Sequence, residues 1–146
     1  MGTHASIAYE REDGTVVASY CHYDGYLQSA GAQLVRNYSE AEKVEDLVVL
    51  GGMSYLADKI DPSAGSTHSF ETPEAGVTVF YHRDRGENWS QTAPTVYDSF
   101  DAWFEANDQE YNYLYVDGTW QCKTYDRFIT NIADTEEVTM ILKEIL

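Results

Sequence analysis

A two-residue turn signal within residues 111–125 constrains the fold more than any other feature of this 146-residue chain. Residues 111–116 and 119–125 are rich in aromatic and β-prone side chains, and Asp117-Gly118 stands between them. Asp-Gly readily adopts the positive φ angles of a tight hairpin turn, so the pattern predicts two antiparallel strands. A second Asp-Gly pair, at residues 13–14, predicts another hairpin that joins residues 7–9 to residues 16–21.

Other segments carry helical periodicity or a helix cap. They predict helices over residues 27–38, from Ser39 to about residue 50 behind a Ser39–Glu42 capping box, over residues 53–60, and from a Ser99 cap onward. A last helix over residues 134–145 is predicted behind an Asp134–Glu137 cap, with Val138, Ile141, Leu142 and Ile145 on its buried face. Residues 77–82 predict a further strand, and residues 61–76 a surface loop. This order predicts a single α+β domain over residues 1–146, with a mainly antiparallel sheet of about five strands and three to five helices packed on it.

The charge excludes several classes of partner. The chain has 25 Asp and Glu against 9 Lys and Arg, a formal charge of −16, which argues against direct nucleic-acid binding and against docking on anionic lipid. No stretch approaches the roughly 20 apolar residues of a membrane span, and the first residues lack the pattern of a signal peptide. We therefore expect a cytoplasmic protein whose two cysteines, Cys21 and Cys122, are free thiols.

The first cluster of chemically versatile side chains lies at residues 20–26, between a predicted strand and a predicted helix. A ligand could meet the side chains of Tyr20, His22, Tyr23, Asp24 and Tyr26 there. The alternative is structural, with the aromatic rings fixing the corner of the chain. Neighbouring residues of a strand face opposite ways and no metal-binding spacing is present, so the sequence predicts neither a metal site nor a cofactor.

The second cluster holds the two arginines that stand alone between Lys59 and Lys123. One interpretation is an internal salt-bridge clamp, and the other is a bidentate grip on a phosphate or carboxylate. The candidate ligand-binding residues of this cluster are His82, Arg83, Asp84 and Arg85.

The third feature is a stretch from residue 98 to residue 117 that has six carboxylates and no Lys or Arg. It is interpreted either as a solvated face or as a surface that binds a basic protein in the manner of DNA. Aromatic residues within it favour the second interpretation because they are typical anchors of interfaces. The candidate partner-binding residues are Asp98, Asp101, Glu105, Asp108, Glu110, Tyr111, Tyr113, Tyr115 and Trp120.

Residues 20–26 read Tyr-Cys-His-Tyr-Asp-Gly-Tyr. The segment resembles the Tyr-Cys-His-Trp-Asp-Gly-Tyr-Pro motif of a widespread family of small, uncharacterised phage and prophage proteins, and differs from it at Tyr23 and Leu27. Residues 34–38, 44–52 and 81–87 and the late hairpin with Trp120 extend the resemblance over most of the chain. It implies a viral origin, expression in the cytoplasm of a bacterial host, and an accessory role.

Three functions follow from these features. The leading hypothesis is a non-catalytic counter-defence or host-takeover protein that occupies a host protein through the acidic aromatic surface. The second is sequestration of a small anionic ligand, such as a nucleotide signal, in a pocket of aromatic, His and Arg side chains. The third is a hydrolase or nuclease that uses His22 or His82 with carboxylates. The second and third hypotheses require the two clusters to meet in one concave site. The edge of the hairpin at residues 111–125 would also allow a homodimer.

Overall fold

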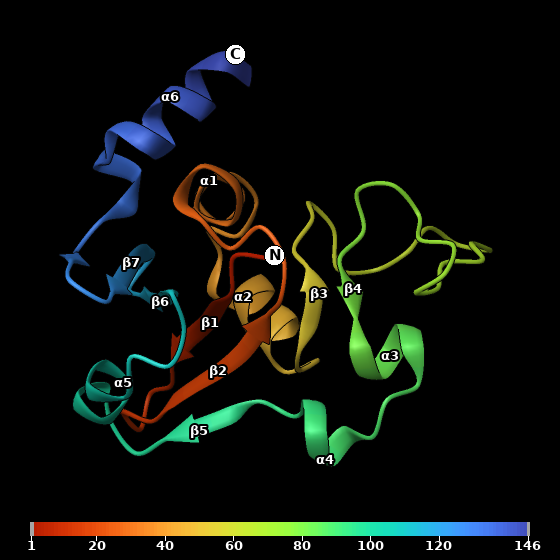
Figure 1. Cartoon of the computed structure of the whole chain (residues 1–146), viewed down its shortest axis with the longest axis horizontal. Helices are drawn as coiled ribbons and strands as arrows, with labels where there is room; N and C mark the ends of the chain where they lie inside the picture. Colours follow the sequence, from red (N-terminus) through yellow and green to blue (C-terminus); the bar gives the residue numbers. More distant parts are fainter. Residues whose placement is uncertain (1, 146) are drawn as a thin grey trace.

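Two β-hairpins lie side by side at the centre of the sheet (Figure 1). The computed structural model describes residues 2–145. In it β1 (Ala5–Glu10) pairs with β2 (Val16–Cys21), and β6 (Tyr111–Val116) pairs with β7 (Thr119–Thr124), both in antiparallel fashion. The hairpins are joined through a parallel pairing of β1 with β6, in which Tyr9 lies opposite Tyr115. The first and last thirds of the chain therefore share one sheet.

Four shorter strands complete the sheet, whose order is β4-β3-β2-β1-β6-β7-β8 with β5 pairing on β2. These strands are β3 (Met53–Tyr55), β4 (Val79–Phe80), β5 (Thr95–Tyr97) and β8 (Phe128–Ile129). Five of the seven pairings between strands are antiparallel. The α+β class and the mainly antiparallel sheet are confirmed in one domain, although the described residues form eight strands where about five were predicted.

Helices cover one face of this sheet and build the main core. A π-helical turn at Leu27–Gly31 leads into α1 (Ala32–Asn37), and α2 (Ala41–Val48) and α6 (Glu136–Ile145) follow later in the chain. Their buried side chains pack against alternate residues of the strands, such as Ile7 and Tyr113. The alternation is the two-residue period of a strand with one face buried. The side chain of Ile145, which was predicted on the buried face of the last helix, lies outside the described residues.

The opposite face of the sheet is only partly covered. There α5 (Phe100–Ala106) places Trp103 on a small second core with Ala8, Ala18 and Leu114. The remaining helical segments are α3 (Tyr81–Arg85), α4 (Trp89–Thr92) and a 3-10 turn at Ile132–Asp134. In Figure 1 the segment from β5 through α5 runs along one side of the sheet, away from α1 and α6.

Local signals predicted some elements well. Asp117 and Gly118 have φ angles of 49° and 81°, as a turn with two left-handed residues requires, and glycine suits the second position because it has no Cβ. Ser99 caps α5 by accepting a hydrogen bond from the N–H of Ala102 at 3.1 Å. Both hairpins and this cap are confirmed.

Other predictions were wrong because pairing within the sheet overrode local pattern. Residues 53–60 begin with strand β3, in which Met53 pairs with both Cys21 and Phe80. Short apolar runs fit a helix and a strand equally well, so the segments that pack beside them in the fold decide which of the two forms. The predicted strand at residues 77–82 is limited to β4 and continues directly into α3.

Two predicted helix caps were also wrong. Glu40 precedes α2 without a side-chain cap, and the carbonyl of Ser39 accepts a hydrogen bond from Tyr115 instead. Thr135, whose hydroxyl accepts the N–H of Val138 at 3.3 Å, replaces Asp134 at the start of α6.

The edge of the late hairpin is less open than the homodimer hypothesis assumed, because β8 pairs with Cys122 and Lys123 of β7. None of the helices in the described residues is long and apolar enough to cross a membrane.

Candidate functional site

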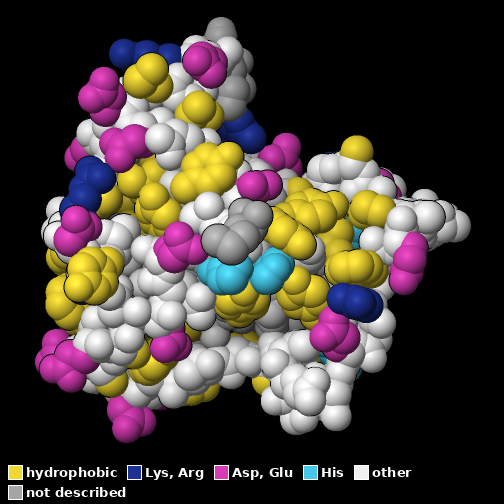
Figure 2. Space-filling view, viewed as in Figure 1, with side chains coloured by type: hydrophobic (Ala, Val, Ile, Leu, Met, Phe, Trp, Pro, Cys, Tyr) yellow, Lys and Arg dark blue, Asp and Glu magenta, His cyan; other side chains and the backbone are white. Residues whose placement is uncertain are grey.

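The predicted Tyr20–His22 corner forms a compact polar and aromatic cluster at the end of β2. Tyr20 lies on the same sheet face as Ala18, opposite the main core. Its hydroxyl and Nδ1 of His22 share a hydrogen bond of 2.7 Å, and the His22 ring stacks on His4 with 4.6 Å between centroids. Partial burial and the neighbouring His4 lower the pKa of His22 below its usual value. Figure 2 shows histidine and hydrophobic side chains gathered at the centre of this face of the molecule.

The rest of the corner is divided between the surface and the core. Tyr23 packs edge-on against His22 and stays about half exposed, and Tyr26 is also exposed. Asp24 adopts a φ of 57°, which lets the chain turn sharply into the π-helical segment. Cys21 is buried, and burial raises the pKa of its thiol to about 12, so this group stays protonated.

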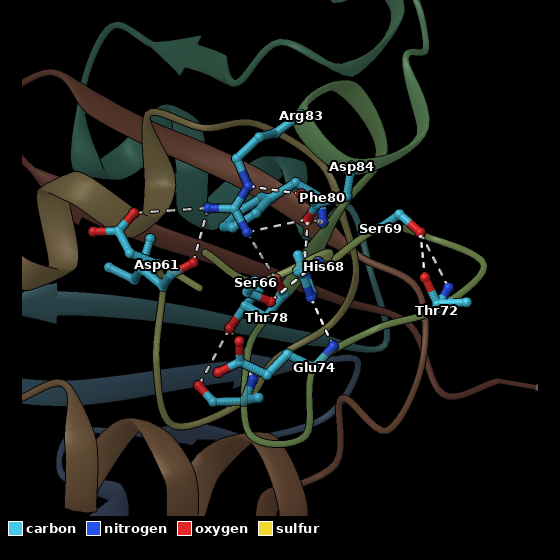
Figure 3. A network of polar contacts seen from close by, with 12 residues as sticks. Asp61, Ser66, His68, Ser69, Thr72, Glu74, Thr78, Phe80, Arg83 and Asp84 are labelled. Atoms are coloured by element: carbon cyan, nitrogen blue, oxygen red, sulfur yellow. Dashed lines mark hydrogen bonds and ion pairs between the residues drawn. The ribbon is translucent and has the colours of Figure 1, made fainter. Parts of the chain in front are cut away.

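Arg83 and Asp84 form an internal clamp that is shown in Figure 3. The Arg83 guanidinium donates hydrogen bonds to both carboxylate oxygens of Asp84, to the Ile60 carbonyl at 2.8 Å and to the Thr78 carbonyl at 3.1 Å. Asp84 also accepts the N–H of Phe80 at 2.8 Å. Burial alone would raise the pKa of Asp84, but these hydrogen bonds and the positive charge of Arg83 hold it below its usual range. The internal-clamp interpretation describes this geometry.

His68 completes the clamp and was missed in the sequence because it lies in the predicted surface loop. Its side chain is 1% exposed, and its Nε2 lies 3.2 Å from Asp84, close enough for electrostatic attraction although poorly aligned for a hydrogen bond. The N–H of Glu74 donates to its Nδ1 at 2.9 Å, so Nε2 is the ring nitrogen that faces Asp84. The loop of residues 61–76 is thus fixed to α3 by a buried polar contact (Figure 3).

The other two candidates of this cluster point elsewhere. Nδ1 of His82 lies 2.7 Å from the carbonyl of Glu87, and its ring packs against Trp89. Arg85 lies over the ring of Phe70 and 3.5 Å from the Glu87 carboxylate. Both side chains are exposed, and neither contacts the Arg83–Asp84 clamp through its side chain.

The two clusters do not meet in a concave site. His22, His82, Asp84 and Arg85 have separate hydrogen-bond and ion-pair partners within the described residues, and of the first cluster only Tyr20 lines one of the main hollows, together with Tyr97 and Asp108. Among these contacts, the four side chains do not converge in the way that the anionic-ligand and hydrolase hypotheses predict. Nor do the His, Cys, Asp and Glu side chains of residues 2–145 form a group of three that could hold a metal ion.

The carboxylates of the predicted acidic surface lie where a partner could reach them. Asp98, Asp101, Glu105, Asp108 and Glu110 are all exposed, and we refer to these five residues as the acidic strip. None of them forms an ion pair with the described Lys, Arg and His side chains. Asp108 accepts the Tyr97 hydroxyl and Glu110 accepts the N–H of His4, which fixes one end of the strip.

The aromatic residues predicted with this surface lie mostly inside the molecule. Tyr113, Tyr115 and Trp120 are at most 8% exposed, on the sheet face that the helices cover. Their polar atoms donate to the carbonyls of Gly25, Ser39 and Tyr38 at 2.7–2.8 Å and thereby tie the helices to the sheet. Their assignment as surface anchors is corrected, because only Tyr111 remains half-buried. Alternation along β6 could have shown that these tyrosines share the buried face.

A separate hollow of about 580 Å³ lies beside the turns of the two hairpins. Its lining includes Tyr9, Tyr115 and several carboxylates, and of these residues only Tyr115 was predicted as a site residue. Comparisons with protein-family models, with curated proteins and with solved structures found no match for this chain.

Proposed function

We propose that this chain is a phage-encoded accessory protein that acts without catalysis in the host cytoplasm, by covering a basic surface of a host protein with its acidic strip. Counter-defence or host takeover is the role that fits such an inhibitor. The observation that carries the proposal is that the five carboxylates of residues 98–110 are all exposed and have no ion-pair partner in the described chain. Arg83 and Arg85, the cations nearest in sequence before it, are engaged by other carboxylates.

The electrostatics favour such an encounter. Exposed carboxylates without ion-pair partners, on a protein with net charge −16, create a field that speeds association with a basic partner and weakens as salt is added. Figure 2 shows acidic side chains spread over the region of α5. Trp103 and Phe100 hold this short helix on the second core, so the strip is presented on a packed surface.

The test is charge reversal with a matched control. The variant Asp98→Lys, Asp101→Lys, Glu105→Lys changes three strip residues that make no side-chain contact with a cation, and it spares Asp108 and its hydrogen bond to Tyr97. The control, Asp46→Lys, Glu71→Lys, Glu144→Lys, changes the net charge equally at exposed positions outside the strip. Each protein is used to capture partners from a lysate of a candidate host at low and high salt.

We expect the strip variant to lose a partner that the control retains, and the captured amount to fall as salt rises. Equal capture by both variants would contradict a specific role for the strip. Adding duplex DNA to the capture then separates two mechanisms. Displacement of the partner by DNA identifies a DNA-mimic-like contact, and retention identifies direct inhibition at another basic surface.

A further inference from the structure

Three phenylalanines meet at the open edge of the sheet, on the face opposite the main core. Phe100 and Phe104 of α5 pack on the second core, and Phe128 of β8 packs against both of their rings. The ring centroids of Phe104 and Phe128 lie 5.1 Å apart, and those of Phe100 and Phe128 lie 6.2 Å apart. We refer to these three residues as the phenylalanine cluster. No described strand pairs with the outer edge of β8, which ends the order of the sheet.

The phenylalanine cluster remains partly open to solvent. Phe128 is 38% exposed, and Phe100 and Phe104 are half-buried. Single exposed apolar side chains are ordinary, but aromatic rings that adjoin one another at a surface are typical of a site that a partner covers. The tyrosines and the tryptophan that the sequence suggested as anchors lie mostly inside the molecule, so these phenylalanines offer the exposed aromatic surface beside the acidic strip.

The phenylalanine cluster adjoins the acidic strip along α5. Asp101 and Glu105 each directly follow one of the two phenylalanines of this helix. The helix therefore carries an aromatic pair and an acidic pair, and the members of each pair are four residues apart. Because residues four apart lie on one side of a helix, the two pairs form neighbouring stripes. A partner side chain that contacts the rings comes within reach of the carboxylates.

One ring of the cluster already holds a cation from within the chain. Lys123 lies opposite Phe128 in the pairing of β7 with β8, and its Nζ is 5.0 Å from the centroid of the Phe104 ring. This lysine forms no ion pair with a described carboxylate, so the contact with the ring is not secondary to a salt bridge. Among the described residues no cation lies over the ring of Phe100 or Phe128. These two rings remain open to a cation of a partner.

We propose that the phenylalanine cluster receives arginine side chains of the partner that the acidic strip attracts. The inference rests on the proposed function, because one partner contacts both surfaces. A guanidinium group stacks its flat face on an aromatic ring while its N–H groups pair with a carboxylate, and an ammonium group has no such face. The charge of −16 repels a second copy of the chain and an anionic lipid surface, so the occupant is an arginine-bearing segment of a basic protein.

Two peptides that differ only in carrying arginine or lysine at the same positions test the proposal. Their affinities for the native chain are measured by fluorescence anisotropy at low and high salt. We expect the arginine peptide to bind about fourfold more tightly, the gain that stacking of one guanidinium on an exposed ring gives. The difference should persist at high salt, although both peptides bind more weakly there, because stacking is screened less than charge pairing.

Variants of Phe128 assign this preference to the ring. Phe128→Leu keeps an apolar side chain but removes the ring, and should lower the preference for arginine to less than about twofold. Phe128→Tyr keeps the ring and should retain the preference. The control is Trp89→Leu, since Trp89 is similarly exposed, at 41%, but lies in α4 outside the cluster. If the native chain binds both peptides equally, or if Phe128→Leu and Trp89→Leu show the same preference, the proposal is overturned.

A charge variant separates this inference from the proposed function. Asp101→Asn, Glu105→Gln should weaken binding of both peptides, because both depend on the acidic strip. Equal binding of the two peptides to the native chain, with loss of both in this variant, overturns the aromatic contact and leaves the strip as a binding surface. Failure of the native chain to bind either peptide overturns the arginine contact, and partner capture with the charge-reversed strip then decides the proposed function alone. A native dimer that Phe128→Leu dissociates in analytical ultracentrifugation would assign the cluster to a second copy and would also overturn the proposal.

Discussion

Residues 81–87 and the acidic strip both attract attention as clusters of charge, yet the structure uses them in opposite ways. Arg83 and Asp84 satisfy each other, and backbone carbonyls and His68 complete the clamp. In the acidic strip, the carboxylates face outward without an ion-pair partner among residues 2–145. A charge cluster that contains both signs tends to close on itself, whereas a cluster of one sign remains open to a partner.

The largest effect is expected where the clamp is broken. Asp84→Asn keeps the shape of the side chain but leaves the partly buried Arg83 with only the exposed Asp61 carboxylate, 3.8 Å away, so we expect the free energy of unfolding to fall by about 3 kcal/mol. Urea unfolding measures this loss. Asp101→Asn is the matched change in the acidic strip and should alter stability by less than about 1 kcal/mol. Comparable losses in the two variants would remove the contrast between a closed and an open cluster.

The tyrosines of β6 allow the same contrast without charge. Tyr113→Phe removes the hydroxyl that donates to the Gly25 carbonyl at 2.7 Å in the core, and we expect a loss of about 1 kcal/mol in the free energy of unfolding. Tyr111→Phe removes a hydroxyl without a hydrogen bond among the described residues and should change stability by less than about 0.5 kcal/mol. Thermal and urea unfolding measure both variants. If Tyr113→Phe and Tyr111→Phe lower the free energy of unfolding equally, Tyr113 is not an internal anchor.

Sequence reasoning succeeded where the signal was local. The Asp117-Gly118 turn and the Ser99 cap depend on a few adjacent residues, and both stand as predicted. Sequence reasoning failed where contacts between segments that are distant in the sequence determine the structure. Nothing local indicates that β1 pairs with β6 in parallel or that β3 enters between β2 and β4, so the hollow at Tyr9 and the strand at Met53 could not be foreseen.

The candidate site was predictable to a similar extent. The Tyr20–His22 contact follows from i and i+2 residues at a strand end, which lie on one face. His4 and His68 reach their places through pairing across the sheet and through the fold of a long loop, and no spacing in the sequence encodes either contact. The two-residue alternation of side chains along β6 predicts that Tyr113 and Tyr115 share one face of the sheet. Their acidic neighbours in the sequence suggested instead that this face is exposed.

His22 is neither as buried as the Arg83–Asp84 clamp nor as exposed as the acidic strip, because it is half-buried and its ring stacks on His4. Its pKa in the folded protein lies below the usual 6.5, so the unfolded chain binds the proton first as the pH falls. The stabilisation from neutral His22 is complete above about pH 6.5 and is lost as the pH falls from there toward the lower folded value. We therefore expect the stability advantage of the native chain over His22→Gln to shrink between pH 7.5 and pH 5.5 in urea unfolding. An advantage that stays constant over this range would exclude a titrating role for His22.

The smallest expected effect concerns the acidic strip, and it has an unusual sign. Glu105 lies in the last turn of α5, where the helix dipole is negative and a carboxylate is unfavourable. Glu105→Lys should therefore raise the free energy of unfolding by about 0.5 kcal/mol, because it also relieves repulsion in a chain of net charge −16. Asp101→Lys, in the first turn of the same helix, should lower it by a similar amount. Urea unfolding of both variants at low salt measures these two changes in the free energy of unfolding. If Glu105→Lys stabilises the fold and also weakens partner capture, the carboxylate of Glu105 is kept at a cost to α5 and serves binding. If Glu105→Lys instead destabilises the chain, the carboxylate at that position serves the fold, and the contrast between open and closed charge clusters does not extend to it.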